Sequence, residues 1–300
     1  MVEKDIENLL ASYIEEFLPN RKLVLIGQQI QIGGYRADLV FQEGPKTKLV
    51  IEVKRGLLMD TAIGQIGKYY GLLRQANPSE DIKMILAANV IPKELAIFMK
   101  EKMNIESLEI PISQINKVAS KHSYGFSDAE TPEQRSCNKE LIKHFVIRSD
   151  KSRVWIFQTN PQKYDIINAL ADERIKEDVW QVNQHKYEIK KGDLGLIWMS
   201  GKEAGIYAVI DIISDPEFLV ESQISAQYWT GEADKLQHKL RVKYIYKLKF
   251  INSPVYKQQL KNIPELSNLS ILRRVPQGTN FTVTDKEWVI ISKMIEKKYE

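Results

Sequence analysis

The pattern of hydrophobic and polar positions predicts two domains of different construction. Over 6–17 the apolar residues recur three and four positions apart, which predicts an amphipathic helix. Strands are predicted over 35–41 and 49–54, followed by a helix that includes 65–69 and a strand over 82–88. This alternation predicts a mixed α/β sheet flanked by helices in the first part of the chain.

From about residue 151 the pattern changes to short strands separated by turn signals such as Gly192-Asp193 and Ser200-Gly201. The predicted strands and helices cover 153–161, 165–171, 179–182, 194–201, 204–211, 241–249 and 285–298. Many short strands with few helices predict a small β-barrel with peripheral helices. The chain is therefore predicted to be a two-domain α/β (α+β) protein.

The boundary between the domains is predicted where the periodicity stops. Residues 120–139 have no apolar pattern and are rich in Ser, Gly, Asp and Pro, a composition typical of a linker. A chain of 300 residues also exceeds one typical domain. We therefore divide it into a first domain over 1–119, a linker over 120–150 and a second domain over 151–300.

Composition narrows the class of protein. With 43% hydrophobic and 27% charged residues the chain can form hydrophobic cores, and no apolar run approaches the roughly 18 residues of a membrane span. The acidic, amphipathic N-terminus does not resemble a signal peptide. The single cysteine, Cys137, excludes an internal disulfide and suits a reducing cytoplasm, and one cysteine with four histidines argues against a zinc site. We expect a cytoplasmic protein without membrane association.

The strands over 35–41 and 49–54 carry the first candidate site. A short link containing Gly44-Pro45 suits a hairpin that places Asp38 beside Glu52, and alternation puts Lys54 on the same face as Glu52. Two carboxylates on an apolar sheet cost desolvation energy unless they are paired or hold a cation. The cluster is therefore either a solvated salt bridge or the ligand set of a divalent metal.

Residues outside the hairpin favour the metal site. Gln65 and Tyr69 are four positions apart, on one face of a predicted helix, and Glu7 lies on the first helix. Together with Asp38 and the Glu52-x-Lys54 signature, these residues resemble the PD-(D/E)xK nuclease superfamily over about the first 115 residues. One departure is Ala37, which stands where the superfamily name places proline. The resemblance implies a restriction-endonuclease-like mixed sheet.

The same resemblance implies the chemistry of the site. Asp38, Glu52 and the backbone carbonyl of Val53 would hold Mg²⁺, for which Mn²⁺ can substitute, because Mg²⁺ prefers oxygen ligands. Lys54 would favour the attacking water as hydroxide and counter the charge on the phosphate. Glu7 is expected to complete the outer shell of the metal, and Gln65 to orient Lys54 or the attacking water. Arg36 and Tyr69 are expected to contact the DNA backbone.

A second resemblance covers about residues 151–297. The segments Trp-Ile-Phe-Gln-Thr-Asn-Pro over 155–161, Lys-Gly-Asp over 191–193, Ile-Trp-Met-Ser-Gly over 197–201 and Ala-Gly-Ile-Tyr-Ala-Val over 204–209 are similar to the EVE domain of the PUA-like superfamily. This resemblance implies a pocket that accepts a modified base extruded from a nucleic acid. Such a pocket requires aromatic walls and a few polar groups at the base edge.

The strand ends supply candidates for that pocket. Trp180 and Trp198 are the expected walls, whereas Trp155 alternates with Phe157 and is expected in the core. Tyr228-Trp229, in a polar loop, is a further candidate for strand insertion or pocket closure. The expected readers of the base edge are Gln158, Thr159, Asn160 and Ser200.

A basic segment suggests a contact to the nucleic-acid backbone. Between Lys235 and Lys261 the chain carries eight Lys or Arg residues and no Asp or Glu. Arg241, Lys243 and Lys247 alternate along a predicted strand, which by itself would suit a solvated outer face. Beside the nuclease domain that the first resemblance implies, we expect these three residues to contact the phosphates of the DNA backbone.

The two predicted domains lead to one hypothesis. A base reader joined to a nuclease predicts a modification-dependent restriction endonuclease that cuts double-stranded DNA bearing modified bases, with modified cytosine as the expected target. Cutting both strands requires two active sites, so a homodimer is expected at least on DNA. Three alternatives stay open: a DNA-repair nuclease, an RNA-directed nuclease, and a reader of nucleic acid with no enzymatic activity.

Overall fold

A computed structural model describes residues 1–129, 152–231, 237–273 and 278–298 of the chain. The chain divides into two compact units, residues 1–129 and 130–300. Most of the segment expected as a linker lies outside the described residues.

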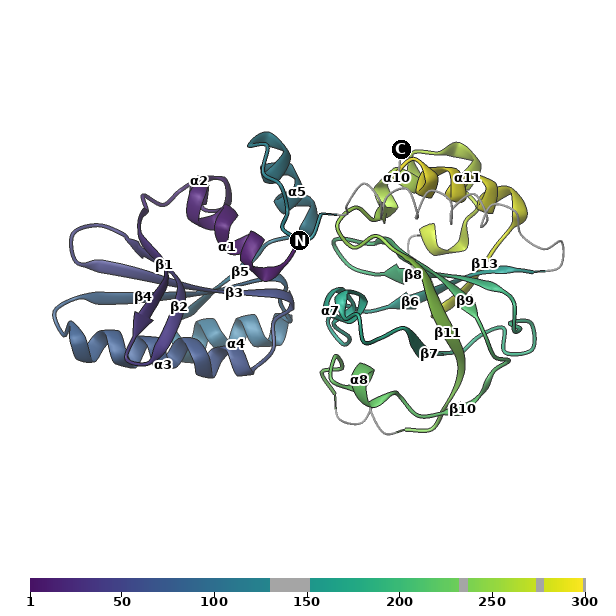
Figure 1. Cartoon of the computed structure of the whole chain (residues 1–300), viewed down its shortest axis with the longest axis horizontal. Helices are drawn as coiled ribbons and strands as arrows, with labels where there is room; N and C mark the ends of the chain where they lie inside the picture. The colour runs from purple at the N-terminus through teal and green to yellow at the C-terminus, as the bar shows by residue number, and fades with distance from the viewer. Residues whose placement is uncertain (130–151, 232–236, 274–277, 299–300) are drawn as a thin grey trace. The chain divides into compact units, whose positions relative to one another are not determined.

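The first unit is built on a five-stranded mixed sheet in the order β1-β2-β3-β4-β5 (Figure 1). β1, β2 and β3 pair antiparallel, and β3, β4 and β5 pair parallel. The strands are β1 Val24–Ile32, β2 Tyr35–Gln42, β3 Thr47–Leu57, β4 Asp81–Val90 and β5 Ile105–Glu109. The predicted hairpin and the predicted strand over 82–88 are therefore confirmed.

Helices lie on both faces of this sheet. The crossover helices α3 and α4 lie on one face and α1, α2 and α5 on the other (Figure 1). Their bounds are α1 Glu3–Ser12, α2 Ile14–Phe17, α3 Thr61–Ala76, α4 Lys93–Met103 and α5 Ile112–Lys121. The buried strands β3 and β4 are apolar on both faces because helices cover both.

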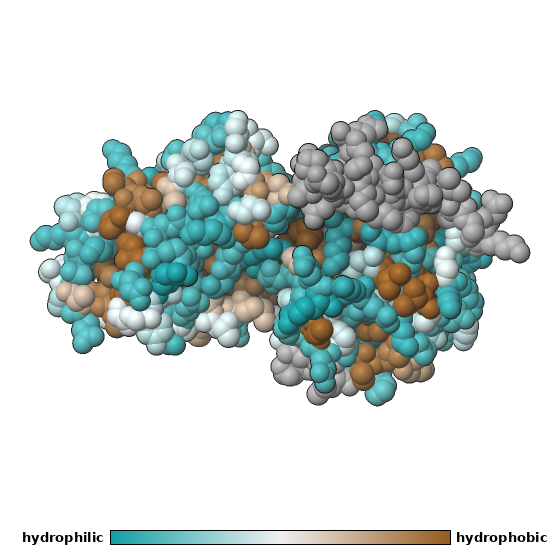
Figure 2. Space-filling view, in the orientation of Figure 1, coloured by the Kyte–Doolittle hydropathy of each residue, from teal (hydrophilic) through white to brown (hydrophobic). Residues whose placement is uncertain are grey.

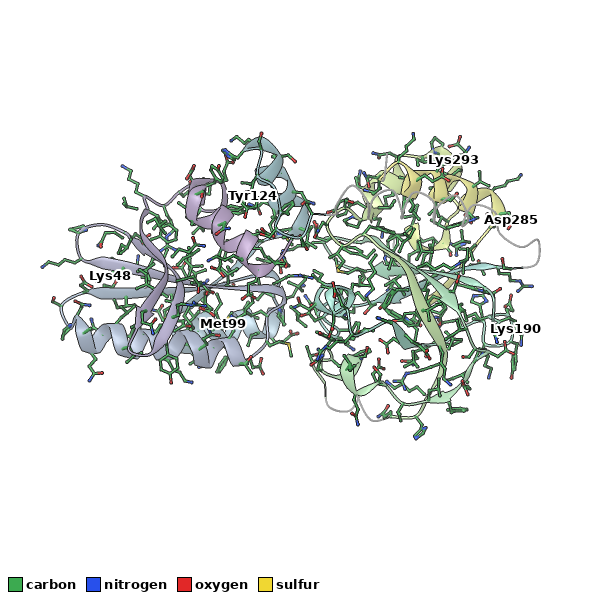
Figure 3. The ribbon with its side chains drawn as sticks, in the orientation of Figure 1. Lys48, Met99, Tyr124, Lys190, Asp285 and Lys293 are labelled. Carbon is green, nitrogen blue, oxygen red and sulfur yellow. The ribbon has the colours of Figure 1, made fainter. Side chains whose placement is uncertain are left out.

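The first unit extends beyond residue 119. The hydroxyl of Tyr124, labelled in Figure 3, donates to Oδ1 of Asp5 over 3.1 Å, and the backbone N–H of Ser127 donates to the same oxygen over 3.0 Å. These bonds attach the segment after α5 to α1. The polar composition of 120–129 thus reflects a chain that is held by side-chain hydrogen bonds rather than by an apolar face.

The second unit is a curled, eight-stranded half-barrel in the order β10-β11-β9-β8-β6-β13, with β12 paired to β9 and β7 paired to β11 (Figure 1). β6 and β8 are parallel, and the other pairs are antiparallel. The strands are β6 Val154–Thr159, β7 Glu177–Gln181, β8 Leu194–Met199, β9 Gly205–Ile212, β10 Glu217–Leu219, β11 Lys239–Lys249, β12 Val255–Tyr256 and β13 Asn280–Val283. The predicted fold class is confirmed.

Short helices surround the half-barrel. They are α7 Ile166–Ala171, α8 Gln223–Ala226, α10 Lys257–Lys261, η1 Pro264–Leu266, η2 Ser270–Leu272 and α11 Asp285–Glu296. The main core forms where α11 packs on the sheet, with Trp288 against strand residues such as Ile156 and Leu196. Trp155 is fully buried, as predicted, and its indole N–H donates to Asp193 over 2.8 Å.

In the described part of the chain, no helix is both long and apolar enough to cross a membrane. Figure 2 shows a face that is largely hydrophilic, with hydrophobic side chains in separate areas.

Candidate active site and binding pocket

The hairpin of β2 and β3 brings the two predicted acids together. Leu39 pairs with Ile51, so Asp38 and Glu52 occupy the next opposed positions. Both are buried, at 7% and 0% exposure. The backbone N–H of Val53 donates to Oδ2 of Asp38 over 2.8 Å, and Nζ of Lys54 lies 2.6 Å from Oε1 of Glu52. The three groups expected to form one site therefore converge.

The electrostatics of this cluster are unfavourable for two bare carboxylates. Burial and the neighbouring charge of Asp38 raise the pKa of Glu52 to about 7, although Lys54 opposes the shift. Burial and the charge of Glu7 also raise the pKa of Asp38, against the Val53 N–H and Lys54. Burial alone would lower the pKa of Lys54, but its bond to Glu52 and the nearby acids raise it. Lys54 is therefore charged, and the acids are short of positive partners.

Gln29 connects Asp38 to Glu7 and was not foreseen from the sequence. Its side-chain N–H₂ donates to Oδ1 of Asp38 over 2.9 Å and to Oε2 of Glu7 over 2.7 Å. Gln29 has a φ of 55°, just after a register shift at Gly27 in β1. A positive φ is costly for a residue other than glycine and is concentrated at functional sites. The detectable signal was the isolated Gly27 inside a strand pattern, which suggests a bulge.

Glu7 lies at the edge of this cluster. It accepts from Gln29 and from Lys4, whose Nζ is 2.9 Å from Oε2. Among the residues that the structure describes, no group of three or more His, Cys, Asp or Glu could hold a metal ion. Glu7 is thus placed outside a pair formed by Asp38 and Glu52.

Gln65 and Tyr69 form a structural bridge rather than the contacts expected of them. The Gln65 amide donates to the Tyr69 hydroxyl over 2.8 Å, and that hydroxyl donates to the carbonyl of Arg36 over 2.8 Å. Tyr69 is 2% exposed. Its expected contact to the DNA backbone is corrected, because burial and this bond commit it to fixing α3 against β2. Gln65 points to Tyr69 rather than to Lys54, whereas the side chain of Arg36 is exposed.

One open cavity of about 600 Å³ lies between α1, β1, the start of β2, β3 and α3. Its lining includes the side chains described above, namely Glu7, Gln29, Arg36, Asp38, Glu52, Lys54, Gln65 and Tyr69. Glu3 of α1 also contributes, with its carboxylate 3.9 Å from Nζ of Lys54. A lysine ammonium and two largely buried carboxylates therefore line a cavity that opens to solvent.

A pocket of about 300 Å³ lies in the second unit, at the ends of β6, β7 and β11. Four of the six expected base-binding residues line it, namely Gln158, Thr159, Asn160 and Trp180. Trp198 and Ser200 do not. Trp198 is 2% exposed and packs in the main core, which corrects its expected role as a wall. β8 is buried on both faces, so hydrophobic alternation could not show which face Trp198 occupies.

Aromatic rings form one side of this pocket. The ring of Tyr164 lies 6.3 Å from that of Trp180 and 4.9 Å from that of Trp229. Trp229 is held by a backbone bridge between its own residue and Tyr164. The loop tryptophan that the sequence marked as a further candidate therefore replaces Trp198 beside Trp180.

The polar end of the pocket is a buried ion pair. Nη2 of Arg241 is 3.0 Å from Oε2 of Glu221, and the two side chains are 2% and 5% exposed. Nη1 of Arg241 donates to the carbonyls of Leu219 and Gln237. The expected contact of Arg241 to the DNA backbone is thus corrected, because its guanidinium is buried and committed to protein oxygens.

The two lysines that were expected to contact the DNA backbone together with Arg241 are also paired. Lys243 lies 3.2 Å from Glu217, and Lys247 lies 2.7 Å from Asp211. Both stay partly exposed, and a register shift between Tyr246 and Leu248 interrupts the alternation that the sequence suggested. A salt-bridged outer face therefore describes β11 better than the expected surface of phosphate contacts.

The family model of the EVE domain matches residues 153–294. The second unit therefore contains an EVE domain, at residues 153–294. The match confirms the resemblance predicted over 151–297.

Three solved structures are each similar to part of this chain. A repair endonuclease from Pyrococcus abyssi has 18% identity over 37% of this chain and 47% of its own, with a TM-score of 0.33. An EndoMS–dsDNA complex has 19% identity over 36% and 44%, with a TM-score of 0.32. A hypothetical protein from Leishmania major has 19% identity over 51% and 100%, with a TM-score of 0.37. This chain spans less than half the length of the first two, and comparison with curated proteins gave no match.

The Glu221–Arg241 pair predicts that EVE-domain stability depends on pH. Burial and the charge of Asp178 raise the pKa of Glu221 to about 7, against Arg241 and Lys239. An acid whose pKa is raised on folding contributes stability below its unfolded pKa and loses it as pH rises to the folded value. Between pH 5 and 8 we expect the free energy of unfolding of the wild type to fall by on the order of 3 kcal/mol relative to that of Glu221→Gln.

Urea unfolding followed by tryptophan fluorescence measures this difference. All five tryptophans lie in the EVE domain, so the signal reports on that domain alone. If the free energy of unfolding of the two proteins changed with pH in the same way, the pKa of Glu221 would be the same in the folded and the unfolded chain.

Proposed function

We propose that this protein is a Mg²⁺-dependent endonuclease that cuts double-stranded DNA bearing modified bases, with modified cytosine as the target. The observation that carries the proposal is the convergence of Asp38, Glu52 and Lys54 in an open cavity. In the proposal the first unit hydrolyses the phosphodiester and the EVE domain binds the modified base.

The acidic cluster fits a magnesium ion. Oε2 of Glu52 is buried and has no hydrogen-bond partner in the described part of the chain, an expensive state for a carboxylate oxygen. Asp38 offers a second carboxylate. The Val53 carbonyl faces the same side as the Val53 N–H that binds Asp38, because both groups of a strand residue point to one neighbour. Three oxygens and open space for water suit Mg²⁺, and Mn²⁺ accepts the same ligands.

When bound, the ion supplies electrostatic stabilisation of the phosphate oxygens. The chain's own groups do the rest. The charged Lys54 ammonium lies within the cavity and counters the negative charge that grows on the phosphate as water attacks. Gln29 and Glu7 hold Asp38 in place, and the exposed Arg36 is positioned to contact a flanking phosphate.

The EVE pocket supplies selectivity that the nuclease site lacks. Phosphate contacts carry little sequence information, whereas a base that is flipped into an aromatic pocket can be identified at its edge. Stacking contributes about 1–3 kcal/mol, comparable to the few kcal/mol that flipping costs. Covalent linkage of the two units then raises the effective concentration of the nuclease near a modified base. Cutting both strands requires two copies of the chain on the DNA.

The test uses two duplexes of one sequence, amplified with either cytosine or 5-hydroxymethylcytosine triphosphates. We expect the full chain to cut only the modified duplex, with Mg²⁺ or Mn²⁺ and not with EDTA. Equal cutting of both duplexes would remove the specificity. Cutting confined to an unmodified mismatched duplex or to RNA, included as further substrates, would assign the chain to lesion repair or RNA instead.

A further inference from the structure

The polar end of the EVE pocket carries one acidic side chain, Glu221, in a lining that also includes Lys163, Lys239 and Arg241. Glu221 lines the pocket together with Trp180 and Trp229, and its side chain is 5% exposed. An ionised carboxylate accepts hydrogen bonds and donates none, so Glu221 favours a ligand group that donates hydrogen bonds.

Glu221 is held rigidly and keeps acceptor capacity. Arg241 pairs with Oε2 at 3.0 Å and is itself anchored to the carbonyls of Leu219 and Gln237. A carboxylate offers about four lone-pair sites on its two oxygens, so one ion pair leaves further sites for a ligand. The indole N–H of Trp229 lies near the Glu221 carboxylate but does not form a hydrogen bond with it in the described part of the chain. Its proximity favours the charged form of Glu221 and so acts to lower the pKa of that carboxyl.

We propose that Glu221 accepts a hydrogen bond from the exocyclic amino group of the flipped base, so that the pocket selects 5-substituted cytosines over 5-substituted uracils. This inference rests on the proposed base-binding function. Cytosine carries an amino donor at its 4 position, and acidic side chains pair with that group. Uracil-type bases carry a carbonyl there, whose oxygen would face the carboxylate and be repelled.

A matched pair of ligands tests this selection. Single 5-hydroxymethylcytosine or 5-hydroxymethyluracil residues are placed opposite an abasic site, so that neither base must break a pair to leave the helix. The protein is the full chain carrying Lys54→Met, in EDTA, so that no DNA is cut. Binding is measured by fluorescence anisotropy at pH 8, where Glu221 is ionised.

We expect at least tenfold tighter binding of the cytosine ligand, equivalent to about 1.4 kcal/mol. Glu221→Gln should reduce this ratio to about threefold or less, because an amide can turn either an oxygen or an N–H₂ toward the base. The matched control is Glu217→Gln on β10, which removes an acid that pairs with Lys243 outside the pocket and should keep the ratio. Glu221→Asp, which keeps the charge but shortens the reach, should give an intermediate ratio.

The outcomes separate this inference from the proposed function. A Glu221→Gln protein that is folded by tryptophan fluorescence and keeps the wild-type ratio would overturn the role of Glu221. If that variant does not fold, a wild-type ratio in Glu221→Asp overturns it instead. If the protein with Glu221 intact bound both ligands equally but bound unmodified cytosine more weakly, the selection for the 4-amino group would be overturned and the base pocket would stand. No preference for either ligand over unmodified cytosine would overturn the base pocket and the inference together.

Discussion

Replacement of Lys54 by methionine is expected to slow DNA cleavage by about 10²–10⁴-fold, the range lost when a positioned catalytic group is removed. Methionine keeps the apolar stem of the side chain but removes the ammonium that lies 2.6 Å from Glu52. The phosphate then loses a positive charge at the point where negative charge grows. Binding of DNA should change little, because it depends on many phosphate contacts. Single-turnover cleavage of a modified duplex at saturating Mg²⁺ measures the effect.

The matched control for this experiment is Lys48→Met. Lys48 lies near the start of the same strand, β3, where it pairs with Glu80 at 2.6 Å, and it is labelled in Figure 3. It does not line the cavity of the acidic cluster. Its replacement should leave the cleavage rate within about twofold. Cleavage by folded Lys54→Met at the wild-type rate would exclude the nuclease site proposed here.

The acidic cluster could be predicted from the sequence because its geometry is local. Asp38 and Glu52 lie on two strands joined by a short link, and the period of two in a strand fixes which side chains share a face. Gln29 could not be placed in the same way. Its amide reaches Asp38 where a bulge and a positive φ redirect β1. The isolated Gly27 indicates the bulge, but the positive φ of Gln29 cannot be read from residue types alone.

The pocket of the EVE domain was only partly predictable, for a physical reason. Its walls come from residues far apart in the chain, so alternation within one strand cannot identify them. Trp198 and Trp180 are each the last residue but one of a strand, yet β8 is covered on both faces while β7 borders the cavity. Arg241 reads as part of a basic stripe, but the acid that buries it, Glu221, lies in a separate loop. Long-range charge pairing of this kind leaves no local pattern.

Replacement of Trp180 by leucine is expected to weaken binding of a 5-hydroxymethylcytosine duplex by about 10-fold to 100-fold, since base stacking is worth roughly 1–3 kcal/mol. Leucine keeps apolar bulk against Phe157 and Tyr244, whose rings lie 6.4 Å and 6.0 Å from that of Trp180. The loss should therefore arise from stacking rather than from unfolding.

In Trp180→Leu, DNA binding should be weakened while the maximal rate of cleavage is kept. The DNA concentration at half-maximal cleavage should rise for the modified duplex, whereas the maximal rate should stay near the wild-type value because the acidic cluster is untouched. The matched control is Tyr187→Leu, an aromatic residue of the same domain that is 80% exposed and does not line the pocket. An unchanged preference for modified DNA in folded Trp180→Leu would mean that the modified base is read elsewhere. A fall in the maximal rate alone would mean instead that the pocket acts on the cleavage step.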